Sequence, residues 1–236
     1  MVYPQQRPAL GSAPIDAART AMGGEGNLGA IKSVRLRGET RQLNQFFGSR
    51  PDADEQYVLR SIEISAVLPD RYVMAATRRS GSGRRQGFAG AVLIDQLTGR
   101  PPAKDNPAAL AWQRRSFGEL MLLVLLRTDT AFSLRASATA DGRSIRFTGP
   151  EFDAVMDLHP ESRLPLRLRY GVTMRGPGGP TGETRDNEVQ LLDWKPVGGL
   201  RLPHRLRTAQ NGRMVSEKIF SSIELNPMID PKVFQR

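Results

Sequence analysis

The sequence predicts a mainly β fold, in which a strongly curved antiparallel sheet of about eleven strands forms an incomplete barrel. Three observations support this prediction. Counts of 23 Gly and 17 Pro among 236 residues indicate many turns between short strands. Most segments between these turns alternate apolar and polar residues, and their meander order favours an antiparallel sheet that curls. A single long segment has helical character, so we expect one helix in or over the concave face.

The first 14 residues, MVYPQQRPALGSAP, contain no apolar run of the kind found in export signals, and we expect them to be disordered. Such a lead-in is expected if an export signal has been replaced by a cloning Met. A short helix is predicted over residues 15–22, because Gly23 and Gly24 can end it in a left-handed conformation. We expect residues 15–236 to form one domain, since all-β folds of this length are often single domains.

Two polar, glycine-rich segments, residues 78–86 and 176–186, are predicted as mobile connections. The pairs Asp141-Gly142 and Asn211-Gly212 are strong hairpin signals. The predicted strands, in chain order, cover residues 31–40, 57–68, 71–77, 87–95, 131–138, 144–149, 153–158, 164–175, 187–195, 200–210 and 214–225.

Residues 107–127, PAALAWQRRSFGELMLLVLLR, form the predicted long helix. Leu120 to Leu126 are apolar on every side of a helix, which is typical of a helix enclosed by other structure. The run is too short to span a bilayer, which needs ~20 apolar residues. We therefore expect this helix to fill the interior of the curved sheet.

Two predicted strands show the alternation most clearly. In residues 57–68, Ile62 and Ile64 share one face. In residues 164–175, Leu166, Leu168 and Tyr170 share a face, and arginines occupy the other face. These apolar faces are candidates for the inner surface of the barrel.

The sequence shows none of the motifs or spacings that carry common enzymatic chemistry. The absence of cysteine excludes thiolate catalysis, disulfides and thiolate metal sites. The two histidines, His159 and His204, have no metal-ligand spacing and are read as structural. Paired carboxylates such as Asp153 and Asp157 are more typical of a solvated strand face than of a catalytic pair. We predict no catalytic residue, no metal and no cofactor, and hence not an enzyme.

A net charge of +10 indicates an anionic partner, or else only a solvated basic surface. Nucleic acid is disfavoured, because aromatic residues, on which bases stack, make up only 6% of the chain. An anionic membrane surface or a membrane-bound partner is the better candidate. The segment 78–86 is the predicted contact, and its basic residues are Arg78, Arg79, Arg84 and Arg85.

The C-terminal third, with LDWKPVGGLRLPHRLRT followed by an NG turn and IELNPMIDPKVFQ, resembles the closing strands of the lipoprotein-carrier (LolA/LolB-like) superfamily of exported bacterial proteins. An Ala-rich helix ending in Gly-Gly before LGAIKSVRLRGE is similar to the start of such domains. The resemblance implies an incomplete barrel of about eleven strands with helices over an apolar cavity. It also implies residence in the periplasm and non-covalent handling of acyl chains.

We therefore predict a monomeric periplasmic carrier of a lipid, a lipidated protein or another apolar ligand. The alternative is a structural or partner-binding module of the cell envelope whose interior is filled by its own side chains. The candidate ligand-binding residues lie on the predicted concave face and the long helix: Ile62, Ile64, Phe117, Leu122, Val124, Leu166, Leu168, Tyr170 and Trp194.

Overall fold

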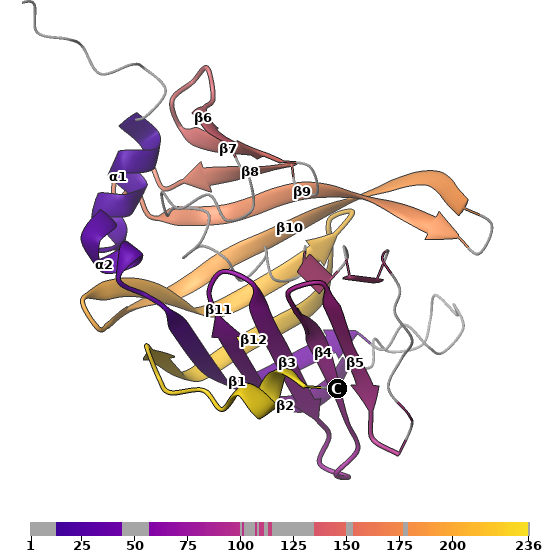
Figure 1. Cartoon of the computed structure of the whole chain (residues 1–236). Coiled ribbons are helices and arrows are strands. Elements are labelled where there is room, and N and C mark those ends of the chain that lie inside the picture. The colour runs from indigo at the N-terminus through magenta and orange to yellow at the C-terminus, as the bar shows by residue number, and fades with distance from the viewer. Residues whose placement is uncertain are drawn as a thin grey trace, which may run out of the picture.

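Twelve antiparallel strands form a single sheet in the order β5-β4-β3-β2-β1-β12-β11-β10-β9-β8-β7-β6 (Figure 1). The computed structural model describes residues 13–43, 57–99, 101, 107, 109–110, 113–114, 135–149, 153–176 and 179–235. The strands are β1 Ser33–Leu43, β2 Tyr57–Val67, β3 Arg71–Thr77, β4 Gly83–Ala89, β5 Val92–Leu97, β6 Arg135–Ala138, β7 Ser144–Thr148, β8 Asp153–Leu158, β9 Pro165–Gly176, β10 Gly179–Val197, β11 Leu200–Gln210 and β12 Arg213–Leu225.

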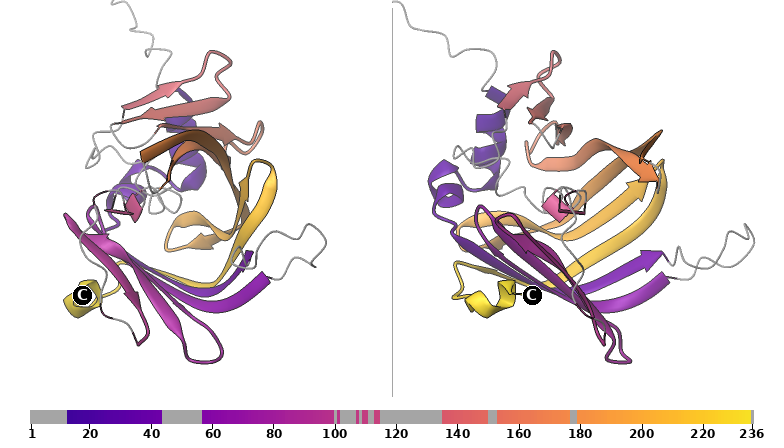
Figure 2. Two further views of the ribbon diagram at one scale, coloured as in Figure 1. Left: turned by 90° about the vertical axis from the view of Figure 1, so that its right-hand side faces the viewer. Right: turned by 45° about the vertical axis from the view of Figure 1, so that its right-hand side comes forward.

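The sheet curves strongly and does not close (Figure 2). Strands β5 and β6 are its two edges, and they are not paired with each other. The N-terminal and C-terminal strands β1 and β12 lie side by side in the middle of the sheet. The prediction of an incomplete antiparallel barrel is confirmed, since the described strands β5 and β6 do not close it.

The predicted strand 87–95 is wrong, because it consists of the end of β4 and the start of β5. A two-residue turn at Gly90 and Ala91 separates them, Ala89 pairs with Val92, and Gly90 has a left-handed φ of 57°. Glycine reaches this conformation without the penalty that a Cβ brings. The sequence around Gly90 and Ala91 has no polar turn residue, so it showed no distinct turn signal.

Strands take up part of the two segments predicted as mobile connections. Strand β4 begins at Gly83, so only residues 78–82 form a turn. Strand β10 begins at Gly179, which pairs with Gly176 at the end of β9. Pairing with a neighbouring strand outweighs the weak strand propensity of glycine and proline in both places.

Two helices at the N-terminus cover one end of the concave side. Helix α1 (Ala13–Met22) contacts β6, β7 and β11, and the short α2 (Glu25–Gly29) leads into β1 (Figure 1). Helix α1 begins two residues before the predicted start, so its first residues belong to the expected lead-in. Its buried residues Ile15, Ala18 and Met22 join the main core cluster.

Part of the predicted long helix is also described. Pro107, Ala109, Leu110, Gln113 and Arg114 are helical, and Leu110 packs against the main core. This region therefore lies on the inner side of the sheet, whereas the apolar run 120–126 lies outside the described residues. Among the residues that are described, no helix is long and apolar enough to cross a membrane.

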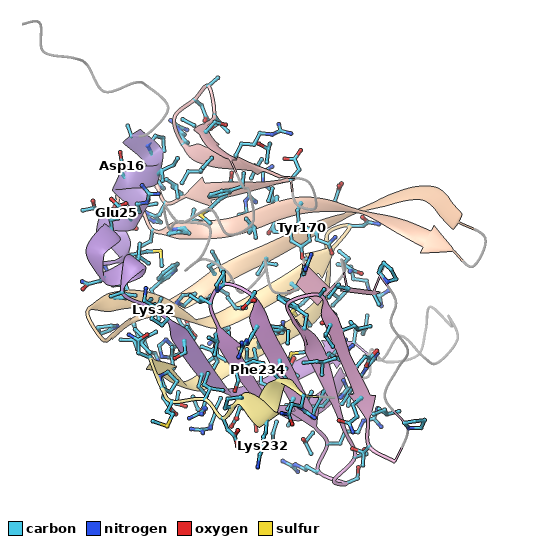
Figure 3. The ribbon with its side chains drawn as sticks, viewed as in Figure 1. Asp16, Glu25, Lys32, Tyr170, Lys232 and Phe234 are labelled. Carbon is cyan, nitrogen blue, oxygen red and sulfur yellow. The ribbon has the colours of Figure 1, made fainter. Side chains whose placement is uncertain are left out.

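A smaller cluster covers the outer face of β3–β5. The C-terminal 3-10 helix η1 (Pro231–Phe234) inserts Phe234 against Val73 and Ile94 (Figure 3). Because directly paired residues of antiparallel strands point to the same side, Val73 and Ile94 identify the outer face, and their sequence neighbours face inward.

Candidate functional site

The concave face of the β1–β4 half is apolar around two predicted residues. Ile62 is paired with Gly38 of β1 and Ala76 of β3, and Ile64 is paired in the same way with Leu36 and Met74. Ile62 and Ile64 are 3% and 2% exposed. Both side chains therefore face the interior of the barrel and are covered in this structure.

The opposite half of the barrel supplies two more predicted residues. Leu168 pairs with Met156 and Val189, and Tyr170, labelled in Figure 3, pairs with Ala154 and Asn187. Leu168 is 2% and Tyr170 is 7% exposed, and both belong to the same core cluster as Ile62 and Ile64. The structure thus brings together four residues from distant parts of the sequence on one concave face.

Leu166 differs from the other residues predicted for this face, because its side chain is 39% exposed. The register between β8 and β9 shifts here: Leu158 pairs with Pro165, whereas Asp157 pairs with Arg167. Leu166 is the extra residue of this β-bulge, and a bulge changes the direction of the side chain. Simple alternation could not reveal it.

Trp194 lies at the margin of the concave core. It is partly buried against the main cluster, and its Nε1 donates a hydrogen bond to the carbonyl oxygen of Leu191 at 3.1 Å. The ladder between β10 and β11 omits the preceding Asp193, whose φ is 56°. The three helix residues Phe117, Leu122 and Val124 lie outside the described residues, so their role stays a prediction.

A close approach of two strands bends the concave face beside Ile62. Gly38 lies at a register shift between β1 and β12, and a Cβ at this position would come within 1.9 Å of the carbonyl oxygen of Ile219. Only glycine permits the two backbones to come this close. The bend positions Phe220 opposite Gly38 and brings its ring into the core.

The four arginines predicted for one mobile loop occupy three different settings, and this prediction is wrong for two of them. Arg84 faces inward from β4 and binds Asp95 of β5 through Nε and Nη2, both at 2.8 Å. Arg85 faces outward and donates from Nη2 to the carbonyl oxygen of Val233 at 2.6 Å. Only Arg78 and Arg79 lie in the exposed turn, where contact with an anionic surface stays a prediction.

The basic outer face predicted for residues 164–175 is neutralised by carboxylates of neighbouring strands. Arg167 Nε lies 2.6 Å and Arg169 Nη2 lies 2.8 Å from carboxylate oxygens of Asp157. Burial raises the pKa of Asp157, but the hydrogen bonds from Arg169, Arg167 and Ser144 lower it more, so the net shift is downward. This face is therefore an ion-pair network and not a free cationic surface.

The histidines have structural partners. Nδ1 of His159 accepts hydrogen bonds from the backbone N–H groups of Glu161 and Ser162. His204 is buried, with its Nδ1 3.2 Å from the carbonyl oxygen of Leu202. In the part of the chain that the structure describes, no group of three metal-ligating side chains occurs.

Two depressions, of about 630 and 540 Å³, lie on the outer side of the β1–β5 half and share Ala75 and Thr77 in their linings. The larger contains the ion pair of Arg37 with Glu63, at 2.8 Å.

Sequence reasoning missed a cationic residue on the concave face. Arg60 pairs with Thr40 of β1 and lies two residues from Ile62 on β2, so it points inward. A lone arginine at the start of a strand looks like a solvated residue. The period of two could have identified its direction, because Arg60 continues the inward series of Ile62 and Ile64.

Comparison with solved structures identifies the architecture. A LolA superfamily protein from Nitrosomonas europaea aligns over 95% of this chain and 97% of its own, with a TM-score of 0.55 and 11% sequence identity. A DUF1329 family protein from Desulfovibrio piger aligns over 95% and 96%, with a TM-score of 0.56 and 9% identity. The chain has a LolA-like fold. No protein-family model and no curated protein matches the sequence.

The LolA-like fold explains the sequence motifs that suggested it. In IELNPMIDPKVFQ, Asn226 has a left-handed φ of 55°, and its Oδ1 accepts a hydrogen bond from the N–H of Lys32 at 2.6 Å. In the other motif, Gly199 of the Gly-Gly turn packs so closely on Gly23 that a Cβ on Gly23 would lie 2.3 Å from the Gly199 carbonyl oxygen. Both motifs connect the N-terminal helices to the closing strands.

Proposed function

We propose that the protein is a periplasmic, non-catalytic carrier or binding protein for a lipid, the acyl chains of a lipidated protein or another apolar ligand. The observation that carries the proposal is the apolar concave face that both halves of an open sheet share. The LolA-like fold supports it, because carriers of that superfamily handle acyl chains without covalent chemistry. The ligand lies between this face and the long helix.

The hydrophobic effect supplies enough free energy for such binding. Each methylene group removed from water contributes roughly 0.8 kcal/mol, so part of one acyl chain gives useful affinity. Ile62, Ile64 and Leu168 are covered in this structure, so an acyl chain reaches them only after the inner side opens locally. Because the described edge strands β5 and β6 do not pair with each other, the barrel is able to widen.

The near-complete burial of the same residues favours one alternative, an envelope module whose interior is filled by its own side chains. The two functions differ in whether a ligand or the protein's own side chains fill the interior of the barrel. A carrier exchanges its interior side-chain contacts for ligand contacts, whereas a module keeps them.

Two neighbouring alanines allow a matched test. Ala76 faces inward beside Ile62, and Ala75 faces outward on the same strand. We expect native protein to enhance the fluorescence of a polarity-sensitive apolar dye and to release it to a competing fatty acid. Ala76→Leu should weaken dye binding severalfold, and Ala75→Leu should not. Dye binding only in denaturant, with both variants folded, would favour the self-filled module.

A further inference from the structure

Cationic side chains gather at one end of the concave face, beyond its apolar part. Arg60 of β2 faces Thr40 of β1, which in turn faces a lysine of β12. Arg84, at the start of β4, pairs with Ala76 and points to the same side, and Arg78 lies in the turn after β3, where its charge acts on Arg60. We name these residues the rim cluster: Arg60, Arg78, Arg84 and Lys218.

The rim cluster lies at the end of the barrel away from the N-terminal helices. Strand β1 begins at Ser33, shortly after α2, and Thr40 lies seven residues further along it, near the far ends of β1 and β2. Ile62 follows Arg60 by two residues on the same face. On β2, the positive charge of Arg60 is therefore followed directly by the apolar side chain of Ile62.

The positive charges of the rim cluster are only partly balanced by described carboxylates. Arg84 is paired with Asp95, whereas Arg60 donates to the neutral Oε1 of Gln42 at 3.0 Å. Among the described residues, no carboxylate forms an ion pair with Arg60, Arg78 or Lys218. Burial and the positive charges of Arg78 and Arg84 lower the pKa of Arg60, so these three cations are close enough to repel one another.

We propose that the rim cluster binds the phosphate head group of an anionic amphiphile whose apolar chain lies along Ile62 and Ile64. This inference rests on the proposed function and adds the class of ligand to it. A guanidinium presents a planar set of donors that suits a phosphate or carboxylate group. A bound anion would also remove the repulsion within the cluster, which no described protein carboxylate removes.

The test compares dodecyl phosphate with dodecyldimethylamine oxide, which carries the same chain on a neutral head group, both below their micelle concentrations. Wild-type protein should bind the phosphate at least about tenfold more tightly, because hydrogen bonds to charged groups are strong. Arg60→Gln combined with Arg78→Gln should abolish this preference and leave amine oxide binding unchanged. Arg71→Gln combined with Arg201→Gln removes the same charge from exposed positions outside the cluster and should keep the preference.

The outcomes separate the two proposals. If both amphiphiles bind equally to wild-type protein, the head-group site is overturned and the carrier stands. If neither binds, both are overturned. Equal loss of preference in the control variant would show a general charge effect and overturn the assignment to the rim cluster. If inorganic phosphate binds as tightly as dodecyl phosphate, the cluster is a free-anion site and the amphiphile proposal is wrong.

Discussion

At the scale of single residues, Asn226 joins the two ends of the chain. Its side-chain oxygen accepts from the N–H of Lys32 at 2.6 Å, and its Nδ2 donates to the carbonyl oxygen of Ala30 at 3.2 Å. The residue also has a φ of 55°, which asparagine tolerates better than most residues. One side chain thus connects the α2–β1 junction to the end of β12.

We predict that Asn226→Ala lowers the free energy of unfolding by about 1–3 kcal/mol, because it removes these hydrogen bonds and strains the backbone. Asn226→Gly should cost less, since glycine adopts the left-handed conformation freely. Chemical denaturation measures both. Equal stability of the alanine variant and wild-type protein would show that the junction does not depend on this side chain.

Asp157 gives a prediction about pH. Its pKa is lowered in the folded protein, so the carboxylate stabilises the fold above its unfolded pKa of about 3.9 and loses this effect as the pH falls through the lower folded value. Asp157→Asn should therefore destabilise the protein by about 1–2 kcal/mol at neutral pH. The difference from wild-type protein should shrink below about pH 4, when measured by urea unfolding at several pH values. A difference that does not change with pH would contradict the ion-pair account.

Sequence alternation predicted the direction of individual residues well where the strands are regular. Ile62, Ile64, Leu168 and Tyr170 all lie on the concave face as expected. The exposure of Leu166 could not be predicted, because the bulge at this residue depends on the register with β8. A bulge that depends on pairing with another strand cannot be read from the sequence of one strand.

At the scale of elements, β4 carries two of the four arginines that were expected in a loop. Arg84 connects β4 to the edge strand β5 on the inner face, and Arg85 connects β4 to the C-terminal segment on the outer face. Arg79 lies in the exposed turn before β4. The same residue type therefore has different structural roles within a few positions.

We expect Arg84→Ser and Arg85→Ser each to lower the melting temperature, with a loss of about 1–2 kcal/mol, because each removes charge-assisted or partly buried hydrogen bonds. Arg79→Ser should change stability by less than about 0.5 kcal/mol. Arg85→Ser should also speed hydrogen exchange near Val233. If all three variants melt together with wild-type protein, these arginines do not stabilise β4.

The pairing of most consecutive strands and most turns were accessible from the sequence because turn chemistry is local, whereas the pairing of β1 with β12 was not. Asn211 and Gly212 have φ values of 47° and 78°, which fits the hairpin that their identities predicted. The turn at Gly90 and the extension of β10 to Gly179 were missed, since pairing with a neighbouring strand decided both. The apolar plug at residues 120–126 lies outside the described residues and stays a prediction.

At the scale of the whole molecule, an open curved sheet combines an apolar interior with a cationic end. Strands β5 and β6 remain unpaired with each other, and the central strands β1 and β12 carry both the apolar row and part of the rim cluster. If the rim cluster binds the head group as proposed, the chain of the amphiphile points toward α1 and its head group toward the far end. Composition showed the excess of positive charge, but only the folded sheet shows where it gathers.

The most direct test of this account is photo-crosslinking with a fatty acid that carries a diazirine near the end of its chain, followed by peptide mapping of the native protein. The account predicts adducts on inward-facing residues of β2, β3 and β9, such as Ile64, Met74 and Leu168, and their loss when unlabelled fatty acid competes. Adducts confined to the outer face, or adducts that unlabelled fatty acid does not reduce, would contradict the claim that the concave face holds the apolar ligand.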